Sequence, residues 1–431
     1  MKYLKWVGLV CISLLFLSGC AVNPVTGRNE LALMNVSTAQ EVELGRQSYA
    51  QALQKMGGIY PNQDLNRYID QVGQRLARTS HRPELNYQFN VLNNSSPNAF
   101  ALPGGFIAIT RGLLLSIENE AQLAAVLGHE IGHVTARHSV QEMQRSSLLN
   151  AGAGLIGTLS VDSGYGGLAN QIGGLTATLL SKRYSRDQEF EADHLGIDYL
   201  ARSGYSVNGA VGLQQVFMNK LGEGSRSDWM TGLFQTHPFS ADRLQANKNY
   251  IDKRYTGANR AFGEDSGAYQ NSIAVLVETR DAYHLYDQAK VAEQNGQIDL
   301  AIEMYHKAMQ QAPDHGLLLT SLGMAYLRKE DMVPARRYLI KAVNADPDYF
   351  QSRMGLGYIY LMNNRSADAA KHFAKSVKLL PTVQGAFLLA EAEADQGHIS
   401  QAITLYRAVV QADKNGKLGK EAAQRLRNLK Q

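Results

Sequence analysis

A 34-residue repeat in the carboxyl-terminal part of the chain most limits what this sequence can fold into. Pro313, Pro347 and Pro381 are spaced 34 residues apart. Small and large residues also recur in phase: Gly323 and Gly357, Tyr326 and Tyr360, and Ala301, Ala335 and Ala369. A period of this length holds two helices, which the small residues allow to pack closely. The sequence therefore predicts an all-α solenoid over 273–431, with about four helix pairs and a basic capping helix over 417–429.

Composition narrows the classes of protein that the chain can belong to. The 431 residues allow two or three domains, and a net charge of +4 gives no sign of nucleic-acid binding. The two cysteines, Cys11 and Cys20, both lie at the amino terminus. They exclude a disulfide framework and a cysteine-type zinc finger in the rest of the chain. Any metal must therefore be bound by histidine and carboxylate side chains.

The amino terminus is typical of a targeting segment. Two lysines precede an apolar stretch over 6–17, which is too short for a stable membrane span. The sequence Leu-Ser-Gly-Cys that ends at Cys20 resembles a bacterial lipobox. We therefore expect a lipoprotein signal peptide over 1–19, acylation of Cys20 and a tether over 20–37, although an ordinary secretory signal with a chance cysteine is the alternative. The resemblance implies a periplasmic protein, anchored to the outer membrane by lipid only.

Residues 38–255 show the mixed pattern of an α+β domain, and a Gly-containing linker over 256–272 separates this domain from the repeats. The stretch 151–180 is dense in glycine and fits a mobile lid or a loose helical insert better than a membrane span. The expected elements of the domain are, in order, helices over 39–56 and 63–79, strands over 87–91 and 106–110, and a long helix over 118–144.

One motif in the expected long helix carries chemistry, the run from His129 to His133 that reads His-Glu-Ile-Gly-His. Residues four apart share one face of a helix, so both imidazoles can bind one zinc ion. Glu130 then lies beside the metal-bound water, as in metallopeptidases. A chance occurrence on an amphipathic helix is the alternative. The motif predicts one Zn²⁺ per chain and Glu130 as the catalytic base.

A catalytic zinc site needs a third protein ligand. Glu189 and Asp193 lie four residues apart in a second expected helix, where Glu189 would complete the ligand set and Asp193 would orient a ligand imidazole. Glu191 is the rival third ligand, but it points away from the side of Asp193. His138 follows His133 by five residues and is rotated off the ligand face, so we expect a packed or solvated side chain there.

These motifs together resemble metallopeptidase family forty-eight, the relatives of HtpX and of the CAAX prenyl endopeptidases. The resemblance covers roughly 40–250 and rests on the Glu-x-x-Ala-Asp motif at Glu189, on Asn-Ala-Phe-Ala at Asn98 and on Pro-Gly-Gly at Pro103. It implies a mainly helical gluzincin domain with a small β-sheet, bound zinc and proteolysis. The carboxyl-terminal period resembles that of tetratricopeptide repeats, a combination similar to the BepA-like periplasmic peptidases, whereas Cys20 is similar to the LoiP-like lipoprotein members.

A further histidine belongs to this resemblance. His237 begins a His-Pro-x-x-x-x-Arg segment that ends at Arg243 and resembles the family's segment near the active site. His237 could donate to the oxyanion of the tetrahedral intermediate, or it could occupy the open zinc position in a self-inhibited state, as the BepA-like relatives suggest. A loop histidine beside a turn proline is the third possibility.

The strand over 105–110 is a candidate edge that would hold substrate in an extended form by main-chain pairing. The residues expected to do so are Phe106, Ile107, Ala108 and Ile109. Such pairing suits unfolded segments, with little selection of side chains.

These features lead to one favoured function and one alternative. The favoured function is a zinc-dependent endopeptidase at the periplasmic face of the outer membrane, which hydrolyses misfolded or unassembled outer-membrane proteins. Its repeats would bind substrate or the outer-membrane assembly machinery. The alternative is a tetratricopeptide chaperone or adaptor for outer-membrane assembly, with a mostly self-inhibited peptidase domain.

Overall fold

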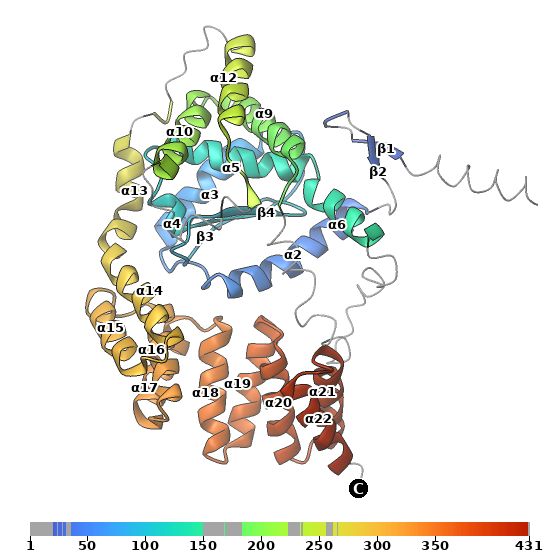
Figure 1. Cartoon of the computed structure of the whole chain (residues 1–431), viewed down its shortest axis with the longest axis vertical. Helices are drawn as coiled ribbons and strands as arrows, with labels where there is room; N and C mark the ends of the chain where they lie inside the picture. The colour runs from blue at the N-terminus through green and yellow to red at the C-terminus, as the bar shows by residue number, and fades with distance from the viewer. Residues whose placement is uncertain are drawn as a thin grey trace, which may run out of the picture.

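Figure 1 shows a mixed domain of helices around a small sheet and, below it, an array of paired helices. The computed structural model describes residues 20–23, 25–27, 29–31, 36–149, 168, 183–222, 233, 236–255, 262–264 and 266–429. The expected signal peptide over 1–19 lies outside the described residues, as does the Gly-rich stretch 151–180 except for Leu168. Among the described residues, no helix has the length and apolar character needed to cross a membrane.

Some helices of the mixed domain pack on its sheet, and others pack on neighbouring helices. Two helices of the domain begin at capping boxes, in which a serine hydroxyl accepts a backbone N–H and a glutamine three residues on reaches back: Ser37 with Gln40, and Ser185 with Gln188. The second box fixes the start of its helix so that Glu189 falls in the first turn. These helices are α2 (Thr38–Lys55), α3 (Gln63–Ala77), α4 (Arg111–Leu114), α9 (Arg186–Ser203), α10 (Asn208–Gly222) and α12 (Ala241–Arg254). Of these, α9, α10 and α12 pack on neighbouring helices.

The sheet has the order β3-β5-β4, with β3 (Gln88–Leu92) parallel and β4 (Ala99–Leu102) antiparallel to the central strand β5 (Phe106–Thr110). Gly104 and Gly105, both at positive φ, form the tight turn that folds β5 back onto β4. Because β3 pairs with the other side of β5, neither edge of β5 can receive a substrate. The expectation of a substrate-binding edge at four residues of this strand is therefore wrong: Phe106, Ile107, Ala108 and Ile109.

The long helix expected over 118–144 is two helices, α5 (Glu120–Thr135) and α6 (His138–Leu149). Between them Arg137 adopts φ 57°, in the left-handed region, which ends the helix. The Arg137 guanidinium donates to Glu41 Oε2 at 3.2 Å and to Val36 O at 2.7 Å. These contacts stabilise the break and let α6 leave in a new direction.

The described residues of the segment expected to be a tether, 20–37, include two strands. Strands β1 (Cys20–Val22) and β2 (Asn29–Leu31) pair as an antiparallel hairpin. Asn23 is buried, and its side-chain amide donates to Ala136 O, at the carboxyl end of α5, at 3.0 Å. The amino terminus of the described chain is therefore attached to the helix that carries His129 and His133.

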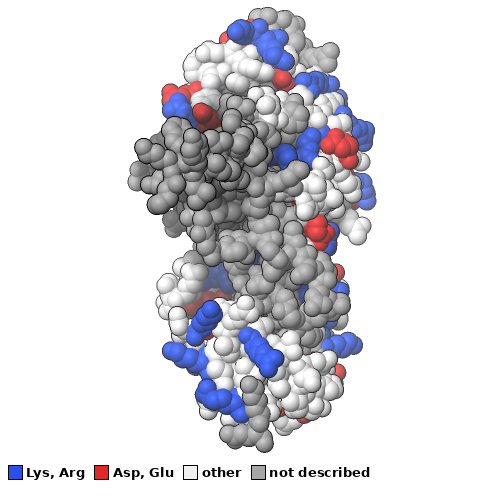
Figure 2. All heavy atoms as spheres, turned by 90° about the vertical axis from the view of Figure 1, so that its right-hand side faces the viewer, with Lys and Arg blue, Asp and Glu red and all other residues white. Residues whose placement is uncertain are grey.

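The expected solenoid is confirmed. Each of the four helix pairs turns at one residue with positive φ: Gly296, Glu330, Asn364 and Gly397. The first three of these positions keep the 34-residue period, and the fourth is one residue out of phase. The pairs are α14 (Arg280–Gln294) with α15 (Ile298–Gln311), α16 (Gly316–Arg328) with α17 (Met332–Ala345), α18 (Phe350–Met362) with α19 (Ser366–Leu379), and α20 (Val383–Asp395) with α21 (Ile399–Ala412). The capping helix is α22 (Lys417–Asn428). Figure 2 shows mainly Lys and Arg among the charged side chains on the lower part of one face, where these last repeats lie.

The linker expected over 256–272 is wrong in its second half. Helix α13 (Ser266–Glu278) begins inside it, and Tyr269 is fully buried, with its hydroxyl donating to Leu114 O at 2.6 Å. The glycines and polar residues of this stretch suggested a loop, but the apolar side chains of α13 extend the core of the mixed domain.

The mixed domain and the first repeats share one hydrophobic core. Tyr60 lies 2.9 Å from the Thr279 hydroxyl, and the buried Arg111 guanidinium lies 3.6 Å from the centroid of the Tyr283 ring. The same buried apolar cluster takes in residues from α13, α15, α16 and the start of α18: Ile273, Leu276, Ala308, Leu317, Leu318 and Tyr349. The first repeats are therefore built against the mixed domain.

Candidate metal centre

Helices α5 and α9 hold most of the candidate residues, and glycines let the two helices approach closely. A Cβ on Gly132 would lie 2.8 Å from Ala192 O, and a Cβ on Gly196 would lie 2.9 Å from the backbone N of His129. Both distances are shorter than a side chain tolerates. The glycines therefore set the helix spacing that brings Glu189 within reach of the histidines.

Four expected residues converge at one point. Ligand atoms of His129, His133, Glu189 and His237 all lie within 4.8 Å of one another. The Nε2 atoms of His129 and His133 are 3.0 Å apart, and the Glu189 carboxylate lies 3.6 Å and 3.5 Å from them. His237 Nδ1 lies 2.9 Å from Glu189 Oε1 and 3.3 Å from His129 Nε2.

The first histidine of the motif contacts Asp193, the residue for which we expected an orienting role. His129 Nδ1 lies 2.9 Å from Asp193 Oδ1. Because a carboxylate only accepts hydrogen bonds, Nδ1 carries the proton and Nε2 presents its lone pair to the cluster. Arg243, from α12, donates to both Asp193 oxygens at 2.7 Å and 2.8 Å and lies 2.5 Å from Glu189 Oε2. The buried guanidinium therefore neutralises two buried carboxylates and fixes their positions.

The second histidine is oriented by two residues for which we expected no such role. His138 Nδ1 lies 2.8 Å from His133 Nδ1, and His138 Nε2 lies 3.0 Å from Glu191 Oε2. The Glu191 carboxylate accepts, so His138 carries its proton on Nε2 and accepts at Nδ1 from His133. His133 Nε2 is then left with a lone pair. His138 reaches His133 only because the chain turns at Arg137, which a continuous helix would not allow.

This donor set fits a zinc ion. Two imidazole lone pairs and the negative Glu189 carboxylate face one another at 3.0 to 3.6 Å, an arrangement that a divalent cation relieves. Burial holds the pKa of His133 well below its ordinary value, against the opposing effect of Glu189, so the ring is neutral, as a metal ligand must be. Glu191, the rival third ligand, lies outside the cluster of four.

Glu130 lies next to this cluster without belonging to it. Its Oε1 lies 3.8 Å from His237 Nε2, and its buried Oε2 has no hydrogen-bond partner within the described part of the chain. Burial raises the pKa of Glu130, while His237 and His129 act in the opposite direction. A buried carboxylate oxygen with no protein partner is suited to bind a water molecule or a substrate.

Tyr184 covers the cluster from one side, and no sequence signal pointed to it. Its ring stacks on His133 with centroids 3.9 Å apart, and its hydroxyl lies 3.0 Å from the Ser139 hydroxyl. The backbone N–H of Tyr184 donates to Thr236 O at 3.3 Å, directly before His237. The segment before α9 and the segment that carries His237 are therefore joined over the site.

Comparison with known proteins agrees with this geometry. Residues 63–251 match Peptidase family M48, and residues 292–356 and 334–383 match tetratricopeptide repeats. Metalloprotease YcaL of Escherichia coli K12 is 31% identical over 185 residues, which cover 42% of this chain and 68% of that protein. The fold and the site thus define a repeat-bearing metallopeptidase-like protein. The chain belongs to peptidase family M48, which confirms the resemblance inferred from the sequence.

Two further relatives are larger proteins. The beta-barrel assembly-enhancing protease of Escherichia coli K12 is 31% identical over 222 residues, which cover 50% of this chain and 44% of that protein. The Yersinia pestis protein of the same name is 26% identical over 389 residues, which cover 84% of this chain and 79% of that protein. The matched part is thus less than half of the first relative and more than three quarters of the second.

Proposed function

We propose that this chain is a zinc-dependent endopeptidase. The observation that carries the proposal is the cluster of His129, His133 and Glu189, with both imidazoles oriented for metal binding and the free Glu130 Oε2 beside them. Membership of family M48 and the printed names of the relatives, a metalloprotease and assembly-enhancing proteases, support it.

The chemistry follows from the residues around the cluster. His129, His133 and Glu189 would hold a zinc ion, which would supply the polarisation of a water molecule and of the scissile carbonyl. Glu130 accepts a proton from the water at Oε2 as the water adds to the carbonyl carbon, and then gives this proton to the nitrogen of the leaving amine as the C–N bond breaks. The raised pKa of Glu130, caused by its burial, suits a group that must hold and release one proton. No covalent enzyme intermediate is needed.

Substrate would pair with β4 and not with β5. Thr110 donates to Asn98 O, so the alternation of an antiparallel pair turns the N–H and C=O groups of Ala99 and Ala101 away from β5. In the resting structure Ala99 and Ala101 are buried and the Ser139 hydroxyl donates to Ala101 O at 3.5 Å, so an incoming peptide would have to displace this contact. An extended peptide on this edge would bind mainly through its backbone, which suits unfolded substrates.

His237 would close the site in the resting protein. Its Nδ1 lies among the ligand atoms, where it would take the fourth zinc position, and the link from Tyr184 to Thr236 holds it there. This arrangement favours the self-inhibited reading of His237 over the oxyanion reading. Substrate or a partner would have to displace the ring.

We place this activity at the periplasmic face of the outer membrane. The lipobox ending at Cys20 supports a lipid anchor, and the relatives named for beta-barrel assembly support misfolded or unassembled outer-membrane proteins as substrates. The repeats would bind these substrates or the outer-membrane assembly machinery, since such solenoids present extended protein-binding surfaces.

A repeat-based chaperone or adaptor is the second candidate. The observation that favours it is the closed site, in which His237 and Tyr184 surround the metal ligands. In that case the peptidase domain would serve mainly as a scaffold for the solenoid.

The variant Glu130→Gln separates the two functions. It removes the base and keeps the ligands, so we expect normal zinc content and a loss of about 10²- to 10⁴-fold in cleavage of an unfolded outer-membrane protein. Glu303→Gln, an exposed change on α15, is the matched control. Cleavage by Glu130→Gln at the wild-type rate would disprove the mechanism, and full rescue of a null strain by Glu130→Gln would favour the adaptor.

A further inference from the structure

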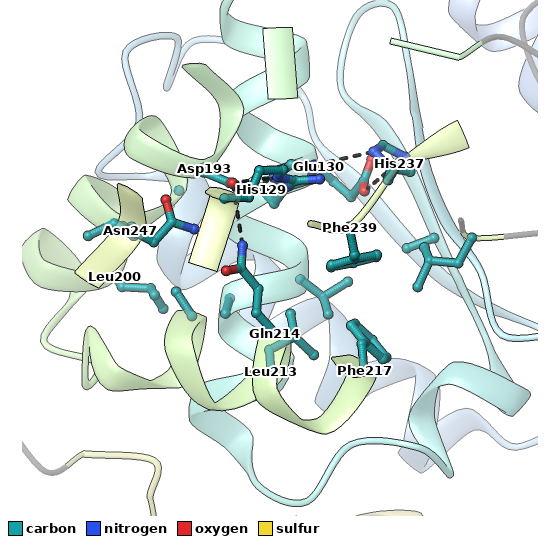
Figure 3. Close-up of a pocket in the computed structure, with 18 of the residues that line it drawn as sticks. His129, Glu130, Asp193, Leu200, Leu213, Gln214, Phe217, His237, Phe239 and Asn247 are labelled. Carbon is teal, nitrogen blue, oxygen red and sulfur yellow. Dashed lines mark hydrogen bonds and ion pairs between the residues drawn. The ribbon is translucent and has the colours of Figure 1, made fainter. Parts of the chain in front are cut away.

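A largely apolar pocket lies directly beside Glu130 and His129 (Figure 3). Its volume is about 40 Å³, and since one buried water needs roughly 10–15 Å³ on this scale, the space suits a short side chain or a few waters. The walls come from α9, α10 and the residues before α12: Leu200, Leu213, Phe217, Leu233 and Phe239.

Two carboxamide oxygens break this apolar lining. Gln214 is 4% exposed and Asn247 is 1% exposed, and neither Gln214 Oε1 nor Asn247 Oδ1 has a hydrogen-bond partner among the residues that the structure describes. The Gln214 amide is oriented by its Nε2, which lies 3.4 Å from Asp193 Oδ2 (Figure 3). Because the carboxylate can only accept, the amide nitrogen faces Asp193 and the amide oxygen is left for another donor.

The pocket also lies on the expected path of a substrate. Ala99, on the edge of β4 that does not pair with β5, lines it together with Glu130 and His237. A peptide paired with β4 and presented to the metal ligands would therefore direct one side chain next to the scissile bond into the pocket.

We propose that this pocket binds one substrate side chain adjacent to the scissile bond and selects an uncharged side chain with a hydrogen-bond donor, of the size of Thr, Asn or Gln. The inference rests on the proposed function. The two free oxygens require a donor, because buried acceptors left without one are costly. A cationic side chain is disfavoured, because Arg243 lines the pocket and already neutralises Asp193.

Substrate pairs of equal shape test the proposal. Unfolded peptides with one cleavage site would be varied on either side of that site, with Thr against Val and Asn against Leu. At one of the two positions we expect kcat/KM to be about tenfold higher for the member with the donor, since a site built to hydrogen-bond a group rejects the analogue that lacks it. Equal or faster cleavage of Val and Leu peptides at both positions would overturn the proposal.

Variants of the pocket then test whether the preference for a donor side chain depends on the oxygens of Gln214 and Asn247. Asn247→Leu and Gln214→Met each replace a carboxamide by an apolar group of similar shape, so each should bring the Thr-to-Val ratio close to one. Asn249→Leu, an exposed change on the same helix α12, should leave the ratio unchanged. If Asn247→Leu does not fold, Gln214→Met and the substrate pairs still decide the question. An unchanged ratio in a folded pocket variant would refute the role of that oxygen.

A binding measurement distinguishes failure of the proposal for the pocket from failure of the proposed peptidase function. In zinc-loaded Glu130→Gln, fluorescence anisotropy would measure the dissociation constants of labelled Thr and Val peptides without cleavage. Tighter binding of the Thr peptide supports the pocket even if the wild type cleaves no peptide, an outcome that would reject only the peptidase. Equal dissociation constants for the Thr and Val peptides would mean that water alone satisfies the two oxygens. This result would overturn the proposal for the pocket.

Discussion

Each histidine of the metal-binding motif is oriented by a different device. His129 donates to a carboxylate, whereas His133 pairs with Nδ1 of His138, whose Nε2 faces the Glu191 carboxylate. When the tautomer of a ligand histidine is fixed, the tautomer that cannot bind the metal does not compete, so metal affinity is not reduced. His138 and Glu191 are therefore positioning residues, although neither would touch the zinc ion.

We expect His138→Ala and Glu191→Ala to weaken zinc binding by about 10- to 100-fold, the usual effect of a partner that orients a ligand. Chelator competition on the purified chain measures this directly. His138→Gln should retain more affinity than His138→Ala, because the amide oxygen can still accept from His133 Nδ1. The exposed Asp187→Asn on α9 is the control, and unchanged affinity in both alanine variants would rule out the orienting role.

His237→Ala distinguishes the two readings of that residue by the sign of its effect. If the ring closes the fourth metal position, its loss should raise basal proteolysis, self-cleavage included. If it stabilises the oxyanion, the rate should fall by about 10²- to 10³-fold. We expect an increase, because Nδ1 lies among the ligand atoms. The rate of peptide cleavage by folded, zinc-loaded protein decides between them.

At the scale of elements, periodicity predicted the solenoid and the motif-bearing helix but not the point where that helix ends. The helix ends in the sequence Thr135-Ala136-Arg137, which has no glycine, proline or asparagine. No local sequence signal therefore predicts the left-handed residue between α5 and α6. The break depends on the hydrogen bonds that Arg137 makes with Glu41 and Val36. These two residues lie about a hundred positions earlier in the chain. For this reason the sequence could place His129 and Glu189 but could not place His138.

The strands show the same limit. Alternation and turn residues located β3 and β5, but strand order depends on pairing between segments, which residue patterns do not encode. The sequence therefore assigned the substrate edge to the central strand. It also missed Tyr184, whose position follows from the packing of the segment before α9 on His133.

Helix α19 carries a histidine that makes stability depend on pH. Burial, aided by Arg353 and Lys371, lowers the pKa of His372 from 6.5 to about 4. Between these values the unfolded chain binds more protons than the folded chain, so stability falls as pH drops from about 7 towards 4. For a half-buried ring we expect a loss of about 1 kcal/mol between pH 7 and pH 5.

Urea unfolding of the full chain at the two pH values would test this dependence. His372→Gln should lose less stability on acidification than the wild type, whereas His284→Gln, a change at an exposed histidine of α14, should behave as the wild type does. Equal pH dependence in His372→Gln and the wild type would contradict the assignment.

At the scale of the whole molecule, the shared core determines how the chain can be divided. A truncation at residue 273 would remove Ile273 and Leu276 from a core that also contains Tyr269, and would take away the Thr279 partner of Tyr60. Burying an apolar side chain is worth about 1.5–3 kcal/mol, so such a truncation should destabilise the mixed domain.

We therefore expect one calorimetric transition for the full chain and a marked fall in melting temperature for residues 20–272. A truncation after Leu380 removes only later helices and should leave the melting temperature of the mixed domain nearly unchanged. Two separate transitions in the full chain, or equal stability of the two truncated forms, would show that the core is not shared.

If Cys20 is acylated, the hydrogen bond of Asn23 to the end of α5 limits how far the metal site can lie from the membrane. Asn23 follows Cys20 by three positions in the chain, and a segment of that length spans about 10 Å at most. If Cys20 carries the lipid, the metal-bearing helix is held within roughly that distance of the lipid headgroups at its carboxyl end. The enzyme would then act only on polypeptides at the bilayer surface. Substrates farther away in the compartment would lie beyond its reach.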